Sequence, residues 1–129
     1  MKTKLNHIAL NISDVDEVTN FYQDILGFHL EYQFELNSDF ASKIFGINKQ
    51  AEVFYCTNEH LNLELFVYPD NIKQIFAHIC IKVKDREIIA VKCENEGYPV
   101  TRIQRNDKSD ILFIRDRAGN IFELKEGEL

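Results

Sequence analysis

Apolar and polar residues alternate along eight short stretches of the chain. A period of two is typical of β-strands, because successive side chains point to opposite faces of a sheet. In FAHICIKV (residues 76–83), every second residue from Ala77 onward is apolar, and His78 and Cys80 lie on the other face. The predicted strands are residues 5–12, 28–35, 51–57, 61–68, 76–83, 98–104, 110–116 and 121–126.

Two other stretches have the apolar spacing of helices. In the first, Asp14 begins a capping-box pattern, and apolar residues then recur every three or four positions up to Gly27, a natural C-terminal stop. The second runs from Asp85 to Gly97 with the same kind of start and end. A shorter helix is expected at about residues 40–45.

The order of these elements occurs twice. Each half reads strand, helix, strand, strand, strand, and the distance from the first-strand histidine to the glycine after the helix is 20 positions for His7 to Gly27 and 19 for His78 to Gly97. Such self-similarity indicates tandem supersecondary units. We therefore predict one α+β domain over residues 1–129, built from two tandem βαβββ modules (1–70 and 71–129) whose curved mixed sheets surround a cavity.

Composition narrows the classes of function. The chain has 129 residues, a net charge of −6 and a pI of about 5.2, which disfavours nucleic acid and anionic membranes as partners. No apolar run is long enough for a membrane span, and no signal peptide is recognisable. Cys56, Cys80 and Cys93 are odd in number and widely spaced, which favours reduced thiols and a cytoplasmic location.

Both modules place the same two polar residue types at matching positions. His7 and His78 lie in the first strands, and Glu64 and Glu123 lie in the last strands. By alternation, all four lie opposite the apolar rows. Each one alone is more often an ordinary solvent-facing residue, because a sheet commonly leaves one face wet. Their recurrence in both modules favours a shared site instead.

If the two sheets face each other, these four side chains converge and suit a divalent cation. Two neutral imidazoles and two carboxylates carry a charge of −2, and mixed nitrogen and oxygen donors suit nickel, zinc, cobalt, iron or manganese. An octahedral ion would keep two adjacent positions open for substrate oxygens. A metal there acts as a Lewis acid that stabilises an enediolate, and a carboxylate can act as general base.

The paired modules, the opening HIAL (residues 7–10) and the ending D-x-x-G-N-x-x-E-L (residues 116–124) resemble the vicinal oxygen chelate superfamily of glyoxalases, bleomycin resistance proteins and dioxygenases. The resemblance covers residues 5–126. Arg117 stands where the superfamily commonly has proline.

The His-Glu-His-Glu set is most similar to that of bacterial-type glyoxalase I, or lactoylglutathione lyase. The resemblance implies a lyase or isomerase that binds nickel or zinc and moves a proton within a glutathione hemithioacetal, with Glu123 and Glu64 as catalytic residues. It implies a homodimer whose sites lie between subunits. The implied metal ligands are His7, Glu64, His78 and Glu123.

Four further residues are candidate substrate contacts. Asn11 stands where the glyoxalase pattern has arginine, and Tyr68 stands where it has asparagine, which weakens the case for glutathione. Cys80 suits a soft ligand or a target for an electrophile, although a small buried filler is the commoner role. Lys125 suits an anionic substrate tail, although such lysines are more often merely solvated.

Other functions on the same fold stay open. Metal-dependent alternatives are epimerisation of an acyl-coenzyme A, thiol addition to an antibiotic epoxide, and dioxygenation. A protein that binds drugs without metal is the alternative that is not an enzyme.

Overall fold

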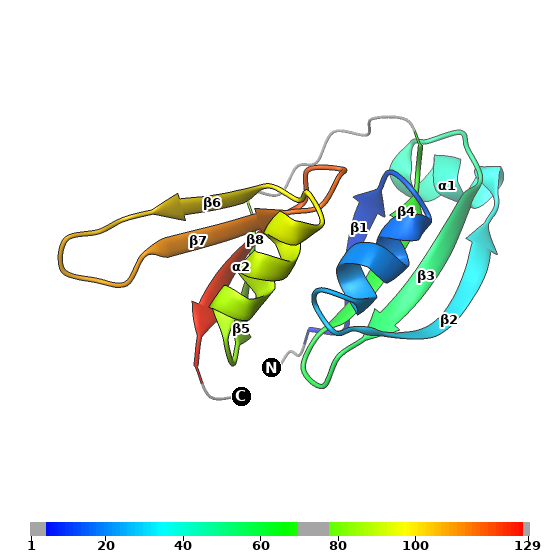
Figure 1. The fold of residues 1–129 in the computed structure, drawn as a ribbon. Coiled ribbons are helices and arrows are strands. Elements are labelled where there is room, and N and C mark those ends of the chain that lie inside the picture. Colours follow the sequence, from blue (N-terminus) through cyan, green and yellow to red (C-terminus); the bar gives the residue numbers. More distant parts are fainter. Residues whose placement is uncertain (1–4, 70–77, 128–129) are drawn as a thin grey trace, which may run out of the picture. The chain divides into compact units, whose positions relative to one another are not determined.

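The chain folds into two compact units, residues 1–72 and 73–129. The computed structural model describes residues 5–69 and 78–127 (Figure 1). Phe76 and Ala77, the expected start of the fifth strand, lie outside the described residues.

Unit 1 forms a four-stranded sheet in the order β1-β4-β3-β2, in which β1 runs parallel to β4 and the other neighbours are antiparallel. The elements in chain order are β1 (Ile8–Ile12), the π-helix η1 (Val18–Gln23), β2 (His29–Leu36), α1 (Ser38–Phe45), β3 (Ala51–Thr57) and β4 (Asn62–Val67).

Unit 2 repeats this topology as β5-β8-β7-β6, with β5 parallel to β8. Its elements are β5 (Ile79–Val83), α2 (Arg86–Asn95), β6 (Val100–Ile103), β7 (Ile111–Arg115) and β8 (Ile121–Glu126). The α+β class and the tandem βαβββ modules are therefore confirmed. That the two modules act as one domain stays a prediction.

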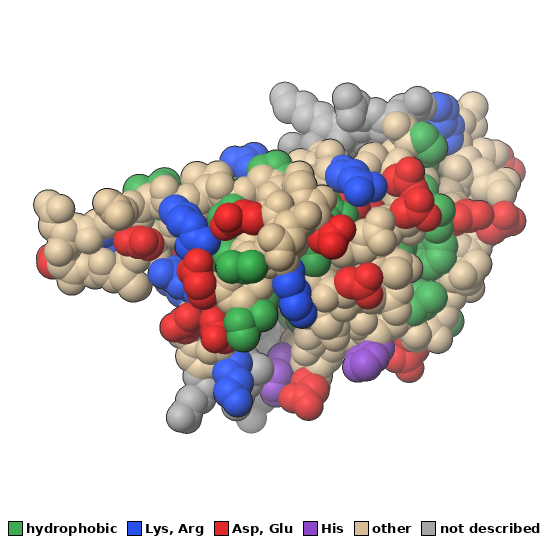
Figure 2. Space-filling model, in the orientation of Figure 1, with side chains coloured by type: hydrophobic (Ala, Val, Ile, Leu, Met, Phe, Trp, Pro, Cys, Tyr) green, Lys and Arg blue, Asp and Glu red, His purple; other side chains and the backbone are tan. Residues whose placement is uncertain are grey.

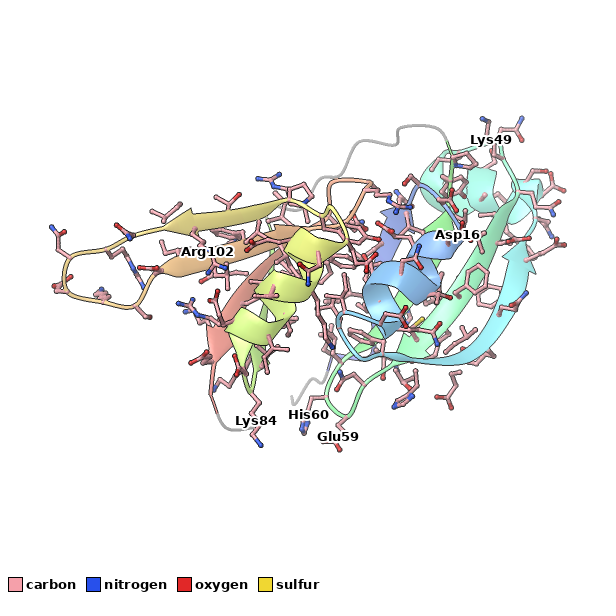
Figure 3. The ribbon with its side chains drawn as sticks, viewed as in Figure 1. Asp16, Lys49, Glu59, His60, Lys84 and Arg102 are labelled. Carbon is pink, nitrogen blue, oxygen red and sulfur yellow. The ribbon has the colours of Figure 1, made fainter. Side chains whose placement is uncertain are left out.

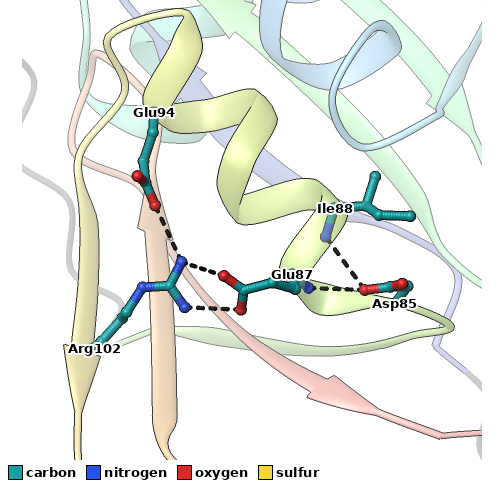
Figure 4. A network of polar contacts seen from close by, with 5 residues as sticks. All are labelled: Asp85, Glu87, Ile88, Glu94 and Arg102. Atoms are coloured by element: carbon teal, nitrogen blue, oxygen red, sulfur yellow. Dashed lines mark hydrogen bonds and ion pairs between the residues drawn. The ribbon is translucent and has the colours of Figure 1, made fainter.

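Local sequence signals explain where the helices begin and end. Asp85 caps α2, since its Oδ1 accepts hydrogen bonds from the backbone amides of Glu87 and Ile88 at 3.1 and 3.3 Å (Figure 4). Gly97, after α2, has a φ of +81°, a conformation that favours glycine. In unit 1, the amide of Asp24 bonds to the carbonyl of Thr19, five residues back, which is the π-helical pattern.

One face of each sheet packs under its helix, as Figure 1 shows for α2. Many strand residues on this face are fully buried, among them Leu10, Leu63 and Leu65 in unit 1 and Leu112, Phe122 and Leu124 in unit 2. The helices contribute Phe21 and Tyr22 in unit 1, and Ala90 and Cys93 in unit 2. The opposite face of each sheet is therefore the one available to a functional site, apart from a second buried cluster on that face of unit 1, formed by Ala51, Val53, Phe66 and Tyr68.

The outer surface of unit 2 carries balanced charge. Arg102 on β6 binds both Glu87 and Glu94 of α2, with nitrogen to oxygen distances of 2.6 to 3.1 Å (Figure 4). Acidic and basic side chains are interspersed over α2 and the β6–β7 hairpin (Figure 2). Among the described helices, none is both long and apolar enough to cross a membrane.

Candidate metal site

In unit 1, the parallel pairing of β1 with β4 brings His7 beside Glu64. The imidazole Nε2 and the carboxylate Oε1 are 3.2 Å apart. Glu64 lies opposite Ala9 in the register, two residues after His7, so both side chains are on the same face. Leu63 and Leu65 on either side of Glu64 are fully buried on the other face. A slip of one residue would expose these leucines, so their burial fixes the direction of Glu64.

Unit 2 repeats this arrangement with β5 and β8. The Nε2 of His78 and the Oε1 of Glu123 are also 3.2 Å apart. Glu123 lies opposite Cys80, two residues after His78, so the register matches that of unit 1 position by position. Phe122 and Leu124 are fully buried and hold Glu123 on the open face.

The two pairs also have matching exposure. Both glutamate side chains are 19% exposed, whereas the histidine side chains are 36% and 40% exposed. The carboxylates are therefore partly withdrawn into the sheet surface, and the imidazoles stand above them.

The donor set in each unit fits a metal ion. Two donors that each lie about 2.1 Å from an ion are about 3.0 Å apart at a right angle and about 3.4 Å apart at a tetrahedral angle. The observed 3.2 Å lies between these values. The Oδ1 of Asn6 is 2.8 Å from the Nδ1 of His7. In the tautomer that carries its proton on Nδ1, His7 donates to Asn6 and turns the Nε2 lone pair toward Glu64, which is the form that a metal ligand needs.

Each unit supplies half of the predicted ligand set. Among the described residues of either unit taken by itself, no group of three or more His, Cys, Asp or Glu side chains lies close enough together to hold a metal ion. The four-ligand set of His7, Glu64, His78 and Glu123 therefore stays a prediction that joins the two pairs.

An aromatic ring packs edge-on against each histidine, and sequence reasoning missed both rings. Tyr55 meets His7 with ring centroids 6.1 Å apart, and Phe113 meets His78 at 5.6 Å. Tyr55 lies opposite Glu64 on β3, and Phe113 lies opposite Glu123 on β7. The sequence feature that could have revealed these rings is an aromatic residue at the matching position of the third strand in both modules. These rings limit the rotation of the imidazoles.

The two pairs differ one strand further out. Tyr32 stacks on Tyr55 in unit 1, with centroids 4.9 Å apart and planes 7° apart. The equivalent neighbour of Phe113 in unit 2 is Thr101. The pKa of the Tyr32 phenol is raised by desolvation and then by Tyr55 and Glu64. Unit 1 therefore has two stacked rings beside its pair, whereas unit 2 has Phe113 with Thr101 as its neighbour.

The candidate substrate contacts of unit 1 lie further along the same face. Asn11 is opposite Phe66 in the β1–β4 register. Tyr68 is 3% exposed and belongs to an apolar cluster with Ala51, Val53 and Phe66. Its hydroxyl is buried without a hydrogen-bond partner among the described residues, and burial raises its pKa. Tyr68 thus packs within unit 1 and keeps an unused polar atom.

The candidate contacts of unit 2 are both exposed. The commoner role of a small buried filler does not apply to Cys80, because alternation puts its thiol on the open face of the sheet, where it is exposed. Its role as a substrate contact stays a prediction. Desolvation and the nearby Glu123 raise the pKa of this thiol, and Lys125 acts in the opposite direction. At neutral pH the thiol is therefore protonated. Cys56 and Cys93 are buried, and all three thiols are free.

Comparison with protein families places this geometry in context. The model of the glyoxalase/bleomycin resistance protein/dioxygenase superfamily matches residues 4–124. The chain belongs to this superfamily. The match includes His7 and His78, which each lie one residue before β1 and β5, and Glu64 and Glu123 on β4 and β8. No curated protein matches the chain significantly.

Solved structures of other superfamily members share the fold. A glyoxalase family protein from Bacillus cereus has a TM-score of 0.75 at 16% identity, over 98% of this chain and 95% of that one. The fosfomycin resistance protein FosX from Listeria monocytogenes, in a mutant complexed with Mn(II) and 1S,2S-dihydroxypropylphosphonic acid, has a TM-score of 0.73 at 19% identity, over 100% and 96%. FosX from Mesorhizobium loti has a TM-score of 0.68 at 16% identity, over 100% and 95%. At these identities the likeness concerns the fold.

Proposed function

We propose that the chain is a divalent-metal-dependent enzyme of glyoxalase type, in which His7, Glu64, His78 and Glu123 together hold one ion. The observation that supports it most is the pair of matching His–Glu contacts, each 3.2 Å long and each at the same register position. Together they supply two nitrogens, two oxygens and a charge of −2. We expect nickel or zinc, and the Mn(II) bound by the FosX structure adds manganese to the metals to be tested.

The reaction we propose is a proton transfer between two adjacent carbons that both carry oxygen. When bound, the ion would supply Lewis-acid stabilisation of negative charge on those oxygens. Glu123, with Glu64, is the general base. Its carboxylate takes the proton from one carbon and returns it to the next, so the product is an isomer of the substrate. The low exposure of both carboxylates limits competition from water.

The two pairs can meet in one chain or across two copies. We propose a homodimer in which each site takes module one from one chain and module two from its partner. We further propose a cytoplasmic protein, in keeping with three free thiols.

The test is turnover of the hemithioacetal of methylglyoxal and glutathione, followed as thioester formation after chelation and reloading with nickel, zinc or manganese. Glu123→Gln should lower kcat by at least about 100-fold, the usual contribution of a positioned base. Glu59→Gln is the matched control, because Glu59 lies at the β3–β4 turn and its side chain is 85% exposed (Figure 3). Bound metal without turnover would overturn this substrate, and absence of bound metal would overturn the enzyme class.

A second candidate is the opening of an epoxide by water or a thiol. The FosX structure favours it, because its ligand carries hydroxyl groups on adjacent carbons. The nucleophile would bond to one epoxide carbon, the carbon–oxygen bond would break, and the oxygen would take up a proton. NMR of fosfomycin with the metal-loaded protein, with and without glutathione, distinguishes this reaction from the first.

A further inference from the structure

Unit 2 contains a cavity of about 260 Å³ beside the candidate ligand Glu123. Its wall combines the start of α2, the connection between β6 and β7, and the second half of β8. The cavity lies wholly inside unit 2, so its description does not depend on unit 1. Drug-sized ligands fill about 300–1,000 Å³, so this cavity suits a small molecule or one end of a larger one.

Three cationic side chains line the cavity, namely Arg86, Arg105 and Lys125. The Nη1 of Arg86 donates to the backbone carbonyls of Asp110 and Leu124 at 2.7 and 3.4 Å. The Nε of Arg105 donates to the carbonyl of Ser109 at 3.0 Å. These acceptors are neutral, so the hydrogen bonds position the guanidinium groups without neutralising them.

Arg102, which does not line the cavity, differs from these three cations because it forms direct ion pairs with Glu87 and Glu94 (Figure 4). Among the described residues, Arg86, Arg105 and Lys125 make no ion pair. Their charge is available to a ligand.

Three carboxylates, those of Asp110, Glu123 and Glu126, also line the wall. The formal charge of the lining is therefore close to zero without a metal. If Glu123 binds a cation, as the proposed function holds, the lining becomes net positive. An anionic ligand then balances it.

We propose that this cavity binds the oxyanion group, a carboxylate or phosphate-type anion, of a small acidic substrate. Arg105 and Lys125 are the specificity-determining residues, because they present the charge, while Arg86 shapes the wall. The inference rests on the proposed function for the role of Glu123, but the anion site itself is a property of unit 2. With this anion site, a compact acid should be a better substrate than an uncharged dicarbonyl.

The test measures anion binding and metal binding separately on the full chain. Inorganic phosphate and acetate are titrated into the metal-loaded and the chelated protein, and the amide NMR signals of Ser109 and Asp110 report occupancy. We expect saturable shifts, tighter with metal. Each of Arg105→Gln and Lys125→Met should weaken binding about tenfold, the effect of losing one charge-assisted hydrogen bond. Lys84→Met is the matched control, because Lys84 is exposed and lies outside the cavity wall (Figure 3).

The outcomes separate the two proposals. Absence of saturable shifts in the wild type, or equal weakening by Lys84→Met, overturns the anion site. Saturable phosphate or acetate binding in a wild-type protein that takes up no added nickel, zinc or manganese supports the anion site and overturns the proposed function. If Lys125→Met fails to fold, Lys125→Gln with a circular dichroism check takes its place. A preference for phosphate over acetate identifies a phosphate-type substrate, and the reverse identifies a carboxylic acid.

Discussion

Replacement of Glu123 by glutamine should remove most of the thermal stabilisation that a divalent cation gives this protein. Glutamine keeps the shape and an acceptor oxygen but lowers the charge of the ligand set from −2 to −1. Phe122 and Leu124 remain buried on either side, so the strand keeps its register and the fold is unchanged. The effect should therefore appear in metal binding and not in the stability of the metal-free protein.

The magnitude follows from linkage. An ion at 100 times its Kd stabilises the folded state by about 2.7 kcal/mol. At about 2.1 cal/mol/K per residue, a chain of 129 residues has an unfolding entropy of about 270 cal/mol/K, so Tm rises by about 10 °C. If the variant binds about 100-fold more weakly, the same ion concentration equals its Kd. The stabilisation then falls to about 0.4 kcal/mol, and the rise in Tm falls to about 1.5 °C.

The assay is a thermal melt of chelated protein with nickel, zinc or manganese added. Glu64→Gln should behave as Glu123→Gln does, because the two carboxylates have the same exposure and the same contact with histidine. Glu59→Gln should keep the full rise of about 10 °C. If Glu123→Gln keeps the full rise, or if Glu59→Gln loses it, the assignment of the ligands is refuted.

Four predictions concern the fold and its thiols. Leu65→Ala should lower the free energy of unfolding by about 2–5 kcal/mol in urea titration, because Leu65 is fully buried; a loss below about 1 kcal/mol would contradict its place in the core. Asp85→Ala should lower it by about 0.5–2 kcal/mol through loss of the α2 cap, and unchanged helix stability would count against that cap. In the native protein a thiol reagent should modify Cys80 first, because Cys56 and Cys93 are buried with pKa values raised to about 11; equal rates for all three would disprove this burial. Since these two folded-state pKa values exceed the ordinary value of 9.0, stability should also fall as pH rises from about 9 to 11.

The strands and most helix ends were predictable because each has a local cause. Alternating side chains located the eight described strands to within a few residues, and Asp85 and Gly97 bounded α2. The helix predicted from Asp14 to Gly27 is shorter in the structure, because η1 runs from Val18 to Gln23 and its N-cap, Glu17, makes no side-chain capping hydrogen bond. The short helix near residue 40 was also predicted, and it begins at Ser38 with Asn37 as its cap. The π-helical bonding of η1 was not predictable, because apolar spacing does not distinguish bonds five residues apart from bonds four apart.

The four candidate ligands could be identified from the sequence, but the contacts that they make could not. The repeat identified His7 with Glu64 and His78 with Glu123, since both pairs occupy matching strands. The edge-on rings of Tyr55 and Phe113 depend on which residues face each other across β3–β4 and β7–β8, and that register is a tertiary property. Cys80 was misjudged because thiols are usually buried, whereas here its strand position decides.

The joining of the two His–Glu pairs around one ion is tested most directly by nickel stoichiometry together with X-ray absorption of the loaded protein. The account predicts one ion per chain with two imidazole nitrogens and two carboxylate oxygens, and loss of that ion in both His7→Gln and His78→Gln but not in the exposed control His60→Gln. Two ions per chain would contradict it. So would an ion that survives removal of either histidine, because each pair would then act alone.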